Sequence, residues 1–287
     1  MAVSPSHRFG QIIGNMLEEM FKPVLESIAL KNDFYFDAVG KSRAARKGKK
    51  LSWKDCYDNT HDLDFVIEKG GSDDALGTPA AFIECAWRRY TKHSKNKAQE
   101  IQGAVLPIAD RFIENRPFLG AILAGEFTAP SLTQLRTSGF NLIYIPYIVI
   151  VEAFIAEGLN IGFDEDTSTD ELTSKVREIE LADRAKIQRV EQRIKVAMKN
   201  EINEFCNGLE LSLTRSVKEI VISPMFGNSQ TFYDLKDAEL FLRNFDSEQV
   251  TDLRFGYFRI FAVYGNGDEI QAKFESLELA LSFLSKI

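Results

Sequence analysis

Apolar residues recur along this chain with two periods, one typical of helices and one typical of buried strands. From His7 to about Lys31 they recur every three or four residues, which predicts a long amphipathic helix. Pro23 predicts a kink or a break within that helix. Short alternating or continuous apolar runs predict strands, and these runs cover residues 33–39, 63–68, 81–86, 118–127 and 141–147. Further helices are expected over residues 94–108, 132–138 and 149–157.

The order of these elements predicts an α/β core built on a mixed sheet. The first three strands follow one another through short connections and can form an antiparallel meander. The later strands are separated by helices, and such crossovers favour parallel pairing. We therefore expect a mixed α+β sheet with helices on both faces over residues 1–163.

The second half of the chain predicts a helical connector and a small repeat domain. A polar, acidic stretch over residues 164–170 precedes a long charged helix over 171–207, broken once, which gives a connector over 164–210. Residues 220–245 and 260–287 then repeat one pattern of strand, aromatic-Gly-Asn turn, strand and amphipathic helix. We expect residues 211–287 to form two β-hairpin-helix units with pseudo-twofold symmetry, which stabilise a dimer or present a binding surface.

Charge is unevenly distributed along the chain. The formal net charge of −7 argues against general affinity for nucleic acid, but residues 41–54 hold seven Lys or Arg and no acidic residue. Such a run is either a solvated loop or an arm that follows a phosphate backbone. The cations predicted to contact DNA are Lys41, Arg43, Arg46, Lys47, Lys49, Lys50, Arg89, Lys92 and Lys95.

Cysteine usage and hydropathy predict a cytoplasmic protein without membrane association. The three cysteines are odd in number and widely spaced, which excludes a disulfide framework and a zinc-ligand pattern. The N-terminal residues contain no apolar signal core, and Pro146 and Glu152 interrupt the most apolar run, residues 140–154.

Two carboxylates lie in otherwise apolar strands. Asp64 stands between Leu63 and Phe65, and Glu84 stands between Ile83 and Cys85. A buried carboxylate is costly unless something positive meets it. Two of them on adjacent strands predict a divalent metal site with oxygen ligands, open to a phosphate. The alternative is that both form structural ion pairs with Arg88, Arg89 or Lys69.

With these residues, the order helix, strand, Asp strand, Glu strand, helix resembles the PD-(D/E)xK nuclease superfamily, which includes many restriction endonucleases. The resemblance covers residues 7–157 and implies a restriction-endonuclease-like core. Asp64 matches the first acid, Glu84 the second, and Glu18 or Glu19 the acid of the leading helix. The lysine expected two residues after the second acid is replaced by Ala86.

The resemblance also implies roles for the site residues. Asp64 and Glu84 would bind Mg²⁺, with Mn²⁺ as an alternative, and Asp62, two residues before Asp64 and on the same face, is a further candidate ligand. Glu18 would hold a metal-bound water. Lys97, or Arg88 on the same strand face as Glu84, would supply the missing cation.

These predictions favour a Mg²⁺-dependent DNA endonuclease of the type II restriction class that acts on double-stranded DNA. A homodimer is expected, because two symmetric sites are the simplest way to cut both strands. A DNA repair nuclease and a non-catalytic DNA-binding or assembly protein with the same fold are the alternatives. A DNA methyltransferase and a phosphate-loop hydrolase are excluded, because the chain has neither a glycine-rich cofactor loop nor a G-x-x-x-x-G-K-[ST] phosphate loop.

Overall fold

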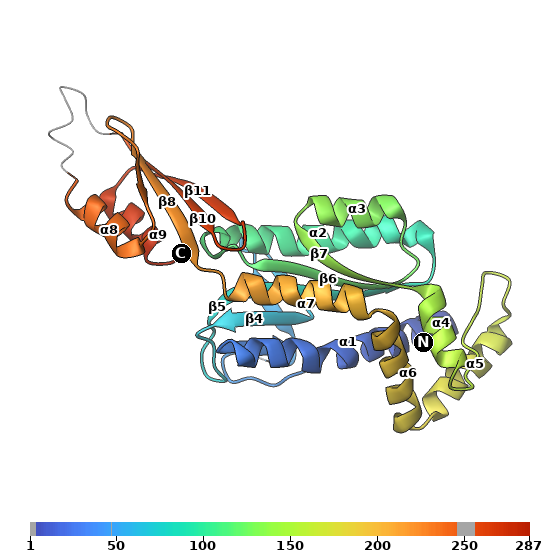
Figure 1. Ribbon diagram of the computed structural model, residues 1–287. Helices are drawn as coiled ribbons and strands as arrows, with labels where there is room; N and C mark the ends of the chain where they lie inside the picture. Colours follow the sequence, from blue (N-terminus) through green and yellow to red (C-terminus); the bar gives the residue numbers. More distant parts are fainter. Residues whose placement is uncertain (1–3, 47, 246–255) are drawn as a thin grey trace. The chain divides into compact units, whose positions relative to one another are not determined.

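The computed structural model describes residues 4–46, 48–245 and 256–287 (Figure 1). The chain divides into two compact units. The first contains Met1–Arg111 and Phe118–Glu210, and the second contains Phe112–Pro117 and Leu211–Ile287. Residues 164–210, predicted as a connector, therefore belong to the first unit.

A five-stranded mixed sheet forms the centre of the first unit. Its strand order is β1-β4-β5-β6-β7. The strands are β1 Phe34–Ala38, β4 Phe65–Lys69, β5 Thr78–Arg88, β6 Phe118–Gly125 and β7 Phe140–Pro146. β1, β4 and β5 pair antiparallel, whereas β5, β6 and β7 pair parallel. The predicted meander followed by crossovers is confirmed, and β7 is an edge strand.

Helices cover both faces of this sheet, as predicted (Figure 1). α1 packs on β1 and β5 from one side, and α2 and α3 pack together on the other side. The helices of this unit are α1 Pro5–Lys31, α2 Ser94–Arg111, α3 Ala129–Thr137, α4 Tyr147–Ile155, α5 Thr169–Leu181, α6 Arg184–Ala197 and α7 Lys199–Leu213. α1 continues through Pro23 as one helix, and the predicted long helix over 171–207 is broken twice. One break is at Asp183, whose carboxylate caps α6 by accepting from the Lys186 amide at 2.6 Å.

A short hairpin was missed by the sequence reading. β2 Leu51–Lys54, at the end of the basic stretch, and β3 Thr60–Leu63, just after it, form a separate two-stranded sheet. Leu51 and Trp53 are buried while Ser52 and Lys54 are exposed, which is the alternation of a one-sided strand. This alternation covers only four residues in a highly charged stretch, and it was therefore not recognised as a strand.

The second unit confirms the internal repeat. β8 Val217–Pro224, β9 Gln230–Phe232 and α8 Leu235–Arg243 form the first hairpin-helix unit. β10 Phe258–Tyr264, β11 Glu269–Phe274 and α9 Leu277–Leu284 form the second. The sheet order β11-β10-β8-β9 places the first strand of each repeat at the centre and the second strand at an edge. This is the arrangement that two equivalent hairpins produce around a twofold axis.

None of the helices in the described part of the chain is both long and apolar enough to span a bilayer.

Candidate functional site

Asp64 lies at the junction between two strands and directly beside Glu84. β3 ends at Leu63 and β4 begins at Phe65, so Asp64 occupies the single position between them. Its amide donates to Glu84 Oε1 at 3.3 Å, and its Oδ2 accepts from the Cys85 amide at 2.7 Å. The two predicted acids are thus brought together by the antiparallel pairing of β4 with β5, which sets Phe65 opposite Ile83.

One oxygen of each carboxylate remains open. The hydrogen bonds above use Asp64 Oδ2 and Glu84 Oε1, and among the described residues no donor contacts Asp64 Oδ1 or Glu84 Oε2. None of the unpartnered side-chain oxygens in that part of the protein is fully buried. Although Glu84 as a whole is only 8% exposed, the two free oxygens are therefore reachable by a ligand.

Burial and mutual repulsion raise the pKa values of the acids. Burial, and then the charge of Asp64, raise the pKa of Glu84 from 4.5 to about 8. Burial also raises the pKa of Asp64, against the opposing effects of the Cys85 amide and Lys97. Glu18 on α1 has its pKa raised to about 7 by burial and then by Asp64. Three carboxyl groups therefore interact electrostatically at one place, and the nearby lysines Lys22 and Lys97 offset their repulsion only in part.

Lys97 is the cation that acts on both central acids. It lies on α2, its charge lowers the pKa of both Asp64 and Glu84, and its side chain is 22% exposed. Arg88 instead donates to the carbonyl of Trp87 at 2.9 Å and lies 3.4 Å from Glu100. Of the two substitutes predicted for the lysine missing at Ala86, Lys97 is the one whose charge reaches the acids.

Asp62 is not part of this cluster, and its prediction as a metal ligand is wrong. It lies on β3, in the separate hairpin sheet, because the strand that was expected to run through 63–68 is interrupted at Asp64. Its carboxylate accepts from Ser52 Oγ and from Lys50 Nζ, each at 2.6 Å. Asp62 therefore stabilises the hairpin.

Two arginines of the basic stretch point into the protein. The Arg43 side chain is fully buried, lies 2.9 Å from Asp37 and donates to Glu68 from both terminal nitrogens. Arg46 donates to both oxygens of Asp37, at 2.9 Å each. The prediction that Arg43 and Arg46 contact DNA is wrong, because the carboxylates of Asp37 and Glu68 on β1 and β4 already bind them.

Arg89 also has a structural role. Its guanidinium donates to the carbonyl of Phe163 and lies over the Tyr147 ring, 3.9 Å from the centroid. These contacts bind the segment after α4 to the end of β5, so Arg89 is not a free phosphate ligand, contrary to the prediction.

The remaining lysines predicted to bind DNA differ in whether another side chain already binds them. Lys41 donates to Tyr35, Lys50 pairs with Asp62, and Lys92 pairs with Glu165. Within residues 48–245, Lys49 and Lys95 are exposed and form no ion pair. Lys47 lies outside the described residues. The basic stretch thus supplies fewer free cations than its composition suggests.

The carboxylate oxygens at this site are suitable ligands for a hard divalent cation, but they do not complete its coordination shell. The free oxygens of Asp64 and Glu84 are the ligand type that Mg²⁺ prefers, and Mg²⁺ commonly takes one or two carboxylates and completes its shell with water and phosphate. The described residues contain no group of three or more His, Cys, Asp or Glu placed to hold a metal together. The fit is therefore to a two-carboxylate site with substrate and water as the other ligands.

These pKa shifts lead to a stability prediction. Because the pKa of Glu84 is about 8 in the folded protein and near 4.5 in the unfolded chain, the unfolded chain loses this proton first as the pH rises. The wild type should therefore lose stability between about pH 4.5 and pH 8. In a metal-free buffer, Glu84→Gln should have nearly the wild-type free energy of unfolding at pH 4.5 and exceed it by about 3 kcal/mol at pH 8.5.

Urea unfolding at the two pH values measures this difference. Glu178→Gln on the exposed side of α5 is the matched control and should follow the wild type. Equal unfolding free energies of Glu84→Gln and wild type at pH 8.5 would show that Glu84 carries no raised pKa.

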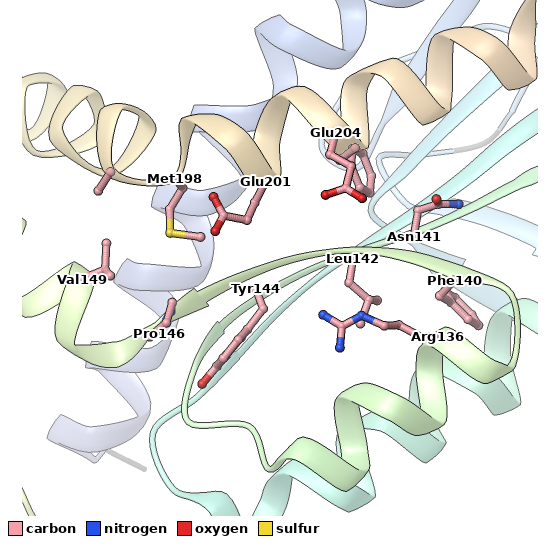
Figure 2. A pocket seen from close by; sticks show the side chains of 12 residues that line it. Arg136, Phe140, Asn141, Leu142, Tyr144, Pro146, Val149, Met198, Glu201 and Glu204 are labelled. Carbon is pink, nitrogen blue, oxygen red and sulfur yellow. The ribbon is translucent and has the colours of Figure 1, made fainter.

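A separate pocket lies along the edge strand β7. Its volume is about 690 Å³, and β7, α7 and the end of α3 supply most of its lining. Figure 2 shows Glu201 and Glu204 of α7 directed toward β7, with Arg136 on the opposite side. None of the acids of the cluster lines this pocket, so it is distinct from the candidate active site.

Comparison with known proteins adds little information about the function of this chain. No family model matches the chain, and no curated protein matches it. A crystal structure titled "Protein of Unknown Function AF1548" aligns with 69% of this chain and 98% of its own, at 13% identity and a TM-score of 0.29. A likeness this weak carries no argument, and the functional interpretation depends on the site itself.

Proposed function

We propose that this protein is a divalent-metal-dependent nuclease that hydrolyses phosphodiester bonds in DNA. One observation carries the proposal: the hydrogen-bonded carboxylates of buried Glu84 and half-buried Asp64 each keep an oxygen open, and their pKa values are raised above the ordinary range. Such mutual repulsion is relieved by a cation, so the pair is better suited to binding a metal than to stabilising the fold.

Each residue of the cluster has a role that its position supports. When bound, a divalent cation polarises the scissile phosphate and lowers the pKa of a bound water. Asp64 and Glu84 would hold that cation through their open oxygens, as ionised carboxylates. Lys97 offsets the negative charge that develops on the phosphate oxygens. Glu18, with a pKa near 7, accepts a proton from or orients a water at the site.

DNA as the substrate, the type II restriction class and Mg²⁺ as the metal are the finer parts of the proposal. They rest on the resemblance to the PD-(D/E)xK superfamily and on the exposed cations Lys49 and Lys95. A DNA repair nuclease would use the same residues.

A non-catalytic DNA-binding or assembly protein is the second candidate. Ala86 favours it, because the strand position that carries the lysine in the superfamily is apolar here and only 4% exposed.

The proposal is tested by incubating the purified protein with mixed plasmid DNA and Mg²⁺ or Mn²⁺. We expect nicking or cutting that EDTA stops and that Glu84→Gln lacks. Equal cleavage by the wild type and Glu84→Gln, or no cleavage by the wild type with either metal, would reject the catalytic function.

A further inference from the structure

Among the described residues of the second unit, the helices lie on one face of the four-stranded sheet. α8 packs on β8 and β9, and α9 packs on β10 and β11 (Figure 1). Both meet the face that carries Ile220, Ile222 and Ile260, which belong to the apolar core of this unit. Because side chains alternate along a strand, the odd-numbered residues of β8 and β10 lie on the opposite face.

That opposite face is outside the core of the unit. Val221, Phe261 and Val263 are partly exposed, and none of them belongs to the core or to the residues packed against it. An apolar centre on an uncovered sheet face is an unusual feature for a surface that stays in water.

The strand register arranges this face, which we name the open face, in three rows. In each row the residues lie opposite one another on neighbouring strands. The basic row is Ser223, Arg259 and Lys273; the apolar row is Thr231, Val221, Phe261 and Gln271; the acidic row is Glu219, Val263 and Glu269. Successive rows are two residues apart along the strands, which is about 7 Å.

Both charged rows are incompletely neutralised. Arg259 and Lys273 are directly opposite each other, and like charges in that position are destabilising. Lys273 lies over the Tyr257 ring at 4.1 Å and is 3.9 Å from Glu275. On the acidic row, Glu219 and Glu269 flank Val263 from its two sides.

We propose that the open face binds the open face of a second copy of this chain. A twofold axis that lies between the two sheets and perpendicular to their strands reverses the order of the rows. The apolar row then meets itself, and the basic row of each copy meets the acidic row of the other. Because the basic and acidic rows lie on opposite sides of the apolar row, the open face is complementary to itself, as an isologous interface requires.

The acidic row distinguishes this partner from a nucleic acid. An extended phosphate backbone would favour one sign of charge over the whole face, and Glu219 and Glu269 would repel it. The area is also informative: strands of eight, three, seven and six residues cover about 400 Å² per partner, which is below the standard size of an interface and typical of a weak one. The dimer should therefore dissociate in the micromolar range. This inference is independent of the proposed nuclease function.

Charge exchange tests the pairing of the rows. Arg259→Glu with Lys273→Glu makes both rows acidic, and Glu219→Lys with Glu269→Lys makes both rows basic. Sedimentation velocity of the full chain should show each variant to be monomeric at concentrations where the wild type is dimeric, with the dissociation constant of the dimer raised at least tenfold. Mixing the two variants should restore a dimer, and so should all four substitutions in one chain.

The outcomes separate the proposal from its alternatives. Circular dichroism and thermal midpoints near the wild-type values confirm that the variants fold. A monomeric wild type up to about 100 µM, variants that remain dimeric, or variants that fail to associate when mixed would each overturn the proposal.

Discussion

Arg43→Ala is expected to lower the free energy of unfolding by about 3–5 kcal/mol. Asp37 and Glu68 lie fully buried on neighbouring strands, and Arg43 binds both of them from the loop after β1. Burial disfavours the charged form of Asp37, but hydrogen bonds from Arg46 and Arg43 outweigh it and keep the pKa below its ordinary value. Without Arg43, Glu68 in particular is left as a buried charge without its cation.

Thermal unfolding measures this loss, which should appear as a midpoint lowered by about 10–15 °C. Lys49→Ala, in the same loop but exposed, is the control and should change the midpoint by less than about 2 °C. Arg43→Lys should be intermediate, because an ammonium cannot make the paired hydrogen bonds to Glu68. If Arg43→Ala is as stable as the wild type, the buried ion network does not stabilise the fold.

Lys97→Ala is expected to lower the rate of DNA cleavage by about 10²–10³-fold, as the loss of one group that stabilises transition-state charge does elsewhere. Lys97 and Arg88 each lie 3.4 Å from Glu100, but only the charge of Lys97 acts on both Asp64 and Glu84. Arg88→Ala should therefore stay within about threefold of the wild type, and it is the matched control.

A rescue variant sharpens this prediction. Ala86 lies on the same strand face as Glu84, at the position where the superfamily carries its lysine. Ala86→Lys combined with Lys97→Ala should recover part of the cleavage rate under single-turnover conditions. Full activity of Lys97→Ala, or a larger loss in Arg88→Ala, would show that Lys97 does not supply the cation.

The sequence predicted the elements whose hydrophobic period is long and uninterrupted. The five strands of the main sheet and the hairpin-helix repeat were found because their apolar runs are bounded by turn residues. The pairing of Asp64 with Glu84 was also predictable, since two adjacent antiparallel strands bring neighbouring residues together. Lys97 was found only as one of several candidates, because its helix is joined to β5 by a short turn whose direction the sequence does not define.

The errors share one physical cause. A count of charges does not show which side chains are buried, and Arg43 and Arg46 are bound by acids that precede or follow them by many residues. Asp62 was predicted at the metal site because the strand break at Asp64 was not recognised. The residues before that break belong to the separate β2–β3 sheet. Such long-range pairing is decided by the tertiary fold and leaves no local signal.

Metal binding at the two acids is measured most directly by the thermal shift that Mg²⁺ produces at pH 8, because this readout does not require knowledge of the DNA sequence. After EDTA treatment and at constant ionic strength, Mg²⁺ at tenfold its dissociation constant should stabilise the wild type by about 1.4 kcal/mol, a shift of about 3–6 °C. Glu84→Gln and Asp64→Asn should show no shift. An unchanged midpoint in the wild type, or the same shift in Glu84→Gln, would contradict a metal site formed by Asp64 and Glu84.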